Sequence, residues 1–239
     1  MPSLQPPFLN ASHLSIALTL MMVGCAAPQM AVAPDLVSAS DPLVIADRSA
    51  MSGSLVDESF KLGPYKVANV DRKWSSTSSG SIGPYSASGT TGGFTYALQA
   101  PGGAGEYKGS CASRKDSNEV KVLGGVLGQD RYEILCHCAG PTQASFTMKA
   151  DTTSHFKGIF QTSQASFPLV GIYTNAKGSS ASDPLGYEVR GNDPLGAVET
   201  TGRGRVWVNR SAATPVREEV ACLFAGLLLY KAPQRAFEK

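Results

Sequence analysis

Residues 214–230 read TPVREEVACLFAGLLLY, and this segment decides the fold class. Thr214 and Pro215 form a helix start, with Thr at the N-cap and Pro at the first helical position. Glu218 and Glu219 follow in the first turns, where the helix dipole favours acidic side chains. The eleven residues after them are apolar on every side, which is too short a run to span a bilayer. The segment therefore predicts a C-terminal helix over about residues 215–231 that is buried on all sides.

The chain upstream of this helix, from residue 59, has the pattern of a turn-rich β domain. The 239 residues include Gly 25 and Pro 15, and runs that alternate with period two lie between turn residues. Two copies of Asp-Pro-Leu-Gly, at 183–186 and 193–196, mark turns before strands 187–190 and 197–200. The other predicted strands cover 64–72, 94–99, 105–113, 119–124, 131–138, 144–150, 155–162, 168–174 and 203–209. In the last of these, Trp207 shares a face with the arginines, opposite Val206 and Val208.

One long stretch between these runs is predicted to be a mobile loop. Residues 75–93 read SSTSSGSIGPYSASGTTGG, and this composition cannot bury an apolar face.

About ten short strands and one buried helix predict a mainly β, single antiparallel domain at 59–239. Closing the sheet into a barrel removes the edges that promote aggregation, and the helix then lies inside the barrel or across its mouth. This arrangement of residues 185–231 resembles the tubby and scramblase-like barrels, in which a C-terminal hydrophobic helix threads a β-barrel. A β-sandwich with the helix packed on one face, or a central strand at 220–230, are the alternatives.

The N-terminus has the features of an export signal. Residues 14–23, LSIALTLMMV, form an uncharged apolar block of signal-peptide length. The block leads into Met22-Val23-Gly24-Cys25, which resembles the lipobox of a bacterial lipoprotein precursor. The resemblance implies a signal peptide at 1–24 and a mature N-terminus at Cys25 that carries palmitate and further acyl chains. More than one chain is what stable anchoring requires.

The resemblance also implies a location. Ala26 is not the Asp that commonly retains a lipoprotein at the inner membrane. A lipid-anchored protein on the periplasmic face of the outer membrane is therefore expected, and a soluble secreted or periplasmic protein is the alternative.

Residues 25–58 are predicted to be a flexible acidic tether after the lipidated cysteine. The stretch 26–58 is rich in Ala, Ser and Pro and carries five acids and one base. A coil of this length reaches on the order of 30 Å, enough to hold a domain off a bilayer. The run Leu43–Ile45 could instead dock as an edge strand. Residues 59–239 carry 20 basic and 14 acidic residues, a net charge of +6.

Four cysteines remain after Cys25. Alternation places Cys111, Cys136 and Cys138 on core faces of two strands that could be neighbours, and Cys222 lies in the predicted helix. In an oxidising compartment such thiols form disulfides. The sequence favours a bond from Cys111 to Cys136 or Cys138, with Cys222 available for the remaining cysteine.

Few residues point to chemistry. The sequence has no Gly-x-Ser-x-Gly elbow, phosphate loop or His-Glu-x-x-His. Strand geometry sends His137 to the face opposite Cys136 and Cys138, so neither a metal nor a cofactor is expected. His155 is expected on a surface strand.

A basic stretch with an aromatic neighbour is the candidate ligand contact. Arg203, Arg205 and Trp207 could grip a phosphate or stack on a sugar, and the alternative is a turn with two solvated arginines.

These features favour a non-catalytic envelope lipoprotein, either structural or a binding module for an envelope protein, a lipid or a glycan. Nucleic acid is not an expected partner, because the net charge is small and the compartment is wrong. The alternative is a periplasmic hydrolase. A polar pocket where a serine and an acid converge on His137 or His155 would favour that enzyme.

Overall fold

Twelve antiparallel strands close into one barrel in this computed structural model, which describes residues 27–48, 58–103, 105–122, 125–151 and 155–230. Consecutive strands pair from β2 to β12, and β1 closes the barrel between β12 and β2. The strands are β1 (Ser40–Ala46), β2 (Phe60–Leu62), β3 (Tyr65–Ile82), β4 (Tyr85–Gln99), β5 (Glu106–Val122), β6 (Gly125–Ala139), β7 (Gln143–Asp151), β8 (Lys157–Gln161), β9 (Ser166–Ile172), β10 (Gly186–Val189), β11 (Gly196–Glu199) and β12 (Arg205–Asn209). Helix α1 (Pro34–Ala39) precedes β1, helix α2 (Thr214–Leu229) follows β12, and a 3-10 turn covers Pro101–Gly103.

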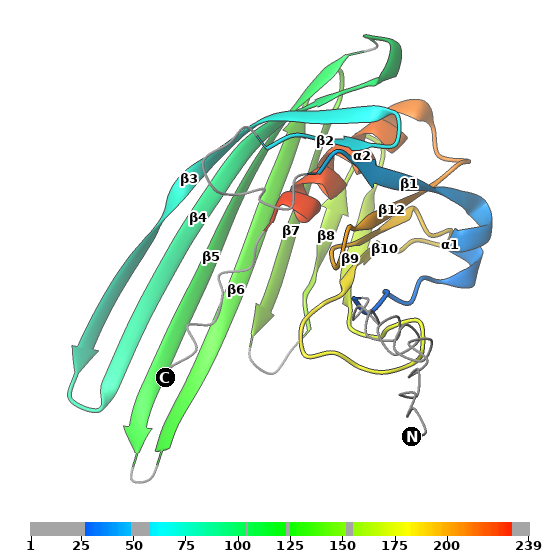
Figure 1. Cartoon of the computed structure of the whole chain (residues 1–239). Coiled ribbons are helices and arrows are strands. Elements are labelled where there is room, and N and C mark those ends of the chain that lie inside the picture. The colour runs from blue at the N-terminus through cyan, green and yellow to red at the C-terminus, as the bar shows by residue number, and fades with distance from the viewer. Residues whose placement is uncertain (1–26, 49–57, 104, 123–124, 152–154, 231–239) are drawn as a thin grey trace, which may run out of the picture.

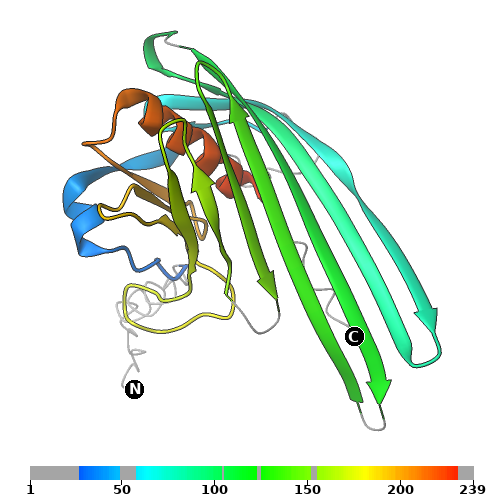
Figure 2. The same ribbon diagram turned by 180° about the vertical axis from the view of Figure 1, so that it is seen from behind.

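The predicted barrel with a buried C-terminal helix is confirmed. Helix α2 lies within the upper part of the barrel in both views (Figures 1 and 2) and packs against β4–β7, β11 and β12. Leu223 and Phe224 are fully buried, and the Phe224 ring meets the Phe160 ring edge-on at 5.9 Å. Each such side chain contributes about 1.5–3 kcal/mol by burial. The sandwich and the central strand at 220–230 are wrong, because the helical segment fills the space that the closed sheet encloses.

Charged and polar groups fix both ends of α2. At its C-terminus the guanidinium groups of Arg48 and Arg72 donate to the carbonyls of Leu228 and Leu229, at 2.7 and 3.0 Å. This is where the helix dipole favours cations. Near the N-terminus, Glu218 and Glu219 are both buried, and each accepts a hydrogen bond. The Tyr107 hydroxyl donates to Glu218 at 3.2 Å, and the Ser163 backbone N–H donates to Glu219 at 3.0 Å.

The start of α2 differs slightly from its prediction. The N-cap is Ala213, which makes no side-chain capping bond, and Thr214 is already helical. Pro215 stands in the first turn as expected.

Four strands are much longer than the barrel requires. β3, β4, β5 and β6 have 18, 15, 17 and 15 residues, and Figures 1 and 2 show their far halves projecting beyond the barrel. We call this projecting part the sheet extension; it comprises 76–82, 85–91, 114–122 and 125–133. It corrects the mobile loop expected at 75–93, since thirteen residue pairs register β3 against β4, from Lys66 opposite Gln99 to Ile82 opposite Tyr85. The Ser/Thr/Gly pattern hid the strands because neither face of the extension is core.

The segment expected to be a tether is largely part of the domain. Met30 and Leu36 are 2% and 0% exposed, and they bury Trp207 in a second apolar cluster outside the barrel. The Met30 backbone N–H donates to buried Glu199 at 2.6 Å. The flexible tether is therefore wrong for residues 27–46, and Leu43–Ile45 lies in a strand that is paired on both sides. The signal peptide at 1–24 and Cys25 lie outside the described residues.

Both disulfides join core cysteines. Cys111 bonds Cys136, its direct partner across the β5–β6 ladder, and Cys138 bonds Cys222 of α2. The pairing matches the favoured alternative of the sequence, and the second bond fastens the helix to the barrel wall.

Candidate binding surface on the sheet extension

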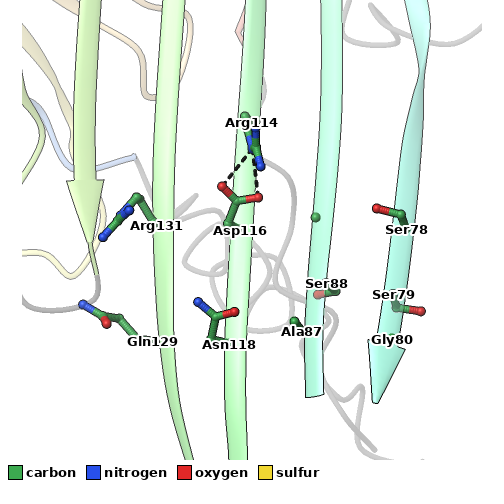
Figure 3. A pocket seen from close by; sticks show the side chains of 11 residues that line it. Ser78, Ser79, Gly80, Ala87, Ser88, Arg114, Asp116, Asn118, Gln129 and Arg131 are labelled. Carbon is green, nitrogen blue, oxygen red and sulfur yellow. Dashed lines mark hydrogen bonds and ion pairs between the residues drawn. The ribbon is translucent and has the colours of Figure 1, made fainter. Parts of the chain in front are cut away.

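A shallow polar trough of about 540 Å³ lies on the outer face of the sheet extension (Figure 3). Strands β3 to β6 all contribute to it. Its lining comprises Ser78, Ser79, Gly80, Ala87, Ser88, Gly89, Arg114, Asp116, Asn118, Gln129 and Arg131.

Strand alternation builds the trough from two unlike halves. On β3 and β4 the outward positions Gly80, Ala87 and Gly89 are small and form a low floor. The partner positions on β5 and β6 carry long polar side chains: Asn118 pairs with Gln129, and Asp116 pairs with Arg131. A Cβ at Gly89 would stand 3.2 Å from Asp116 Oδ1, so a side chain there would crowd the carboxylate. The floor is low because the sequence places small residues beside long ones.

The charges of the trough are nearly balanced. Arg114 Nε donates to Asp116 Oδ1 at 2.9 Å and lies 2.8 Å from Oδ2, which holds both groups at the trough wall (Figure 3). The charges of Arg114 and Asp116 cancel, so Arg131 leaves the lining with a net charge of +1. Guanidinium, carboxylate, amide and hydroxyl groups thus lie together in the shallow trough, and no lining residue is aromatic. This is a set of hydrogen-bond donors and acceptors that suits a ligand rich in hydroxyl groups.

The opposite face of the same strands carries a charged cluster that holds β5 to β6. Lys115 Nζ lies 3.0 Å from Asp130 Oδ2, and the Tyr132 hydroxyl donates to the same carboxylate at 3.0 Å. Burial alone would lower the pKa of Lys115, but its bonds to Asp130 outweigh burial and raise that pKa. Burial likewise would raise the pKa of Asp130, but bonds from Ser117, Lys115 and Tyr132 lower it. Both shifts favour the charged forms, so an ion pair links β5 to β6 on the face opposite Gln129 and Arg131.

The predicted ligand contacts do not form one open site. Trp207 is 4% exposed beneath Met30 and Leu36, so its ring is not available for stacking on a sugar. Arg205 lies 5.0 Å from the Trp207 ring centroid and donates to Glu199 at 2.7 Å. Arg203 is exposed in the turn before β12. Two of the three residues therefore act together, in packing the N-terminal segment against the barrel.

The two histidines of the domain lie in different places. His155 stacks on Tyr173 with ring centroids 3.9 Å apart. His137 lies in a hollow that also contains Ser145 and Ser163, but no carboxylate lines this hollow among the described residues. The Ser145 hydroxyl donates to Gln161 at 3.3 Å. The convergence of serine, histidine and acid that would favour a hydrolase is not found in the described part of the chain.

Sequence reasoning missed the trough. The alternation of Arg114, Asp116 and Asn118 with Ser113, Lys115 and Ser117 was a usable signal, because it is a two-residue period in a run with two polar faces. The usual signal for a strand is apolar alternation, and this run has none because both of its faces are polar.

No helix in the described ranges is long and apolar enough to cross a membrane. Within the same ranges, no group of three or more His, Cys, Asp or Glu side chains is placed to hold a metal ion.

The fold and surface define a helix-filled antiparallel barrel with a projecting polar sheet. No protein-family model matches this chain, and no curated protein and no solved structure matches it.

Proposed function

We propose that the protein is a non-catalytic binding module of the bacterial envelope, anchored through lipid at Cys25, that holds a glycan in the trough of the sheet extension. The observation that carries the proposal is that the molecule has two unlike parts, a filled barrel and a polar sheet extension. The barrel interior is filled by α2, whereas four strands continue past the barrel and present polar side chains to solvent.

The chemistry of the trough supports a glycan among the partner classes. Asn118 and Gln129 lie side by side across the β5–β6 ladder, and each amide offers donors and an acceptor to sugar hydroxyls. The flat floor at Gly80 and Ala87 leaves room for a ring above the sheet. The trough is open along its length, which suits an extended polymer better than a small enclosed ligand.

A pull-down with isolated peptidoglycan sacculi tests the ligand. The full chain should sediment with sacculi, and Asn118→Ala combined with Gln129→Ala should lower the affinity by roughly thirtyfold, because two net hydrogen bonds of about 1 kcal/mol each are lost. Ser145→Ala with Gln161→Ala is the matched control, since that hydrogen-bonded pair lies on the outer face outside the trough. Binding that is absent, or that the trough variant leaves unchanged, would contradict the glycan proposal.

The anchor has its own test. Cys25→Ser should release the protein into the soluble periplasm or block its processing. A normally processed Cys25→Ser protein that stays in the membrane fraction would show that the lipid anchor is wrong.

A further inference from the structure

The strand order brings the start of the described chain, at Ala27, and the hairpin tips to one end of the molecule. Because every pairing is antiparallel, the β3–β4, β5–β6, β9–β10 and β11–β12 connections share this end, which we call the tip end. Met30 bridges Asn175 in the β9–β10 connection, and the Thr201 hydroxyl of the β11–β12 connection donates to the Pro28 carbonyl at 3.1 Å. Figures 1 and 2 show the blue start of the described chain and the tips of β3 to β6 toward the same, lower end.

The two hairpin tips of the extension are apolar and exposed. Ile82, Tyr85 and Leu127 are 85%, 61% and 67% exposed. Ile82 pairs with Tyr85, Tyr85 with Val120, and Val120 with Leu127, so these four residues form one row across four strands, which we call the tip row.

The tip row is not a continuation of the core. The polar trough separates it from the barrel, since the next outward residues along β5 and β6 are Asn118 and Gln129. The sequence at 120–127, VKVLGGVL, is apolar except for Lys121 and the glycines, whereas turns between strands are usually polar. An exposed apolar surface at the end of a polar arm marks a site of contact.

We propose that the tip row docks on the surface of a lipid bilayer, on the side of the molecule where the described chain begins. The inference rests on the anchor of the proposed function. Ala27 lies beside Gly202 at the tip end, and Cys25 is two residues before it. Two extended residues span at most about 7 Å. A lipid on Cys25 therefore holds the tip end close to the bilayer instead of about 30 Å away, as a 33-residue coil would.

The composition of the tip suits this occupant. Tyrosine combines an apolar ring with a polar hydroxyl and is enriched at membrane interfaces. Lys121 can place its ammonium among lipid headgroups while its methylene chain covers apolar surface. Ile82 and Leu127 supply the apolar contact. The lipid and the tip row are then two points that fix how the domain lies on the membrane.

Fluorescent labels on the full chain test the contact. Cysteine replaces Ile82 or Leu127 in separate variants. In two control variants it replaces Leu135 or Ile159, whose apolar side chains on the barrel wall are 47% and 56% exposed. Each protein carries the polarity-sensitive dye NBD and is incorporated into vesicles of phosphatidylethanolamine and phosphatidylglycerol. Dye at 82 and 127 should shift to shorter emission wavelengths and be quenched by aqueous iodide about threefold less than dye at 135 and 159, as expected for burial at the headgroup boundary.

The outcomes separate the two proposals. If the protein floats with the vesicles but iodide quenches all four labels equally, the tip contact is wrong and the anchor stands. If the protein does not float, both fail. If the labels at 82 and 127 are equally protected without vesicles, a second copy of the chain covers the tip row and the bilayer contact is wrong.

Discussion

The two halves of strand β4 differ in almost every respect although one continuous ladder holds them. Phe94, Tyr96 and Leu98 point into the barrel and are at most 6% exposed. Between Tyr85 and Gly93 the strand contains only Ser, Thr, Ala and Gly after its first tyrosine, and none of these residues belongs to the core. Strand β5 changes in the same way beyond Cys111. Regular hydrogen bonding therefore does not by itself indicate where the stability of this sheet resides. Stability should come from the barrel half, and contact with other molecules from the extension half.

Placing a charge in the filled barrel should have the largest effect. Leu227→Asp, or Leu228→Asp, puts a carboxylate where the leucines are 1% and 3% exposed. The unpaired buried charge costs several kcal/mol or forces protonation, and a typical domain is stable by only about 5–15 kcal/mol. The variant should expand or aggregate. Arg203→Ala, in the exposed turn before β12, should melt like the parent, and aspartate variants that also melt like the parent would place the helix on the surface.

Removing each disulfide should rank next. Cys138→Ala with Cys222→Ala opens a loop of 84 residues and should cost about 4 kcal/mol, whereas Cys111→Ala with Cys136→Ala opens one of 25 and should cost about 3 kcal/mol. Urea unfolding of both double variants measures the difference. The helix-to-wall bond should matter more, and the reverse order would show that α2 is held by packing alone.

The ion pair at the C-terminal end of α2 should have a slightly smaller effect. Arg72 binds Glu58 at 2.6 Å and caps the Leu229 carbonyl, and the Glu58 side chain is 3% exposed. Arg72→Met leaves a buried carboxylate without this partner and should cost about 3 kcal/mol. Adding Glu58→Gln should restore part of the loss in thermal melting. No restoration would indicate that the helix cap, and not the stranded carboxylate, accounts for the cost.

Trimming the extension should have the smallest effect on stability. One variant replaces 78–89 and 118–129 each by Asn-Gly, which keeps the pairs Thr77–Thr90 and Ser117–Asp130 as the new hairpin ends and leaves the bond between Lys115 and Asp130 in place. Because the removed residues bury no core, the free energy of unfolding should change by less than about 1 kcal/mol. Binding to sacculi should be lost. A trimmed protein that unfolds would show that the extension supports the barrel.

The same division explains which features could be predicted from sequence. The all-apolar run of α2, the paired Asp-Pro-Leu-Gly turns before β10 and β11, and the core-facing cysteines each carry a local pattern that depends on burial. Trp207 was correctly placed on the face opposite Val206 and Val208. Its burial could not be foreseen, because the residues that cover it are about 170 positions away.

The missed features lack such a pattern. The extension buries neither face, so its strands show no apolar alternation. Met30 and Leu36 dock through isolated contacts with β12 and its neighbours, and single apolar residues among Ala, Ser and Pro resemble those of a linker. One stretch shows part of the trough, because Arg114, Asp116 and Asn118 alternate on β5, but the register that joins four strands into one surface is not encoded in any single stretch.

Hydrogen–deuterium exchange along β4 tests the central claim most directly. Amides at 86–91 and 94–98 lie in the same ladder between β3 and β5, so a difference in exchange reports local stability and not merely hydrogen bonding. The account predicts that 94–98 exchange only through global unfolding, while 86–91 exchange through a local opening at least about tenfold more often, equivalent to about 1.4 kcal/mol. Equally slow exchange over both segments would contradict it, because the extension would then be as stable as the barrel.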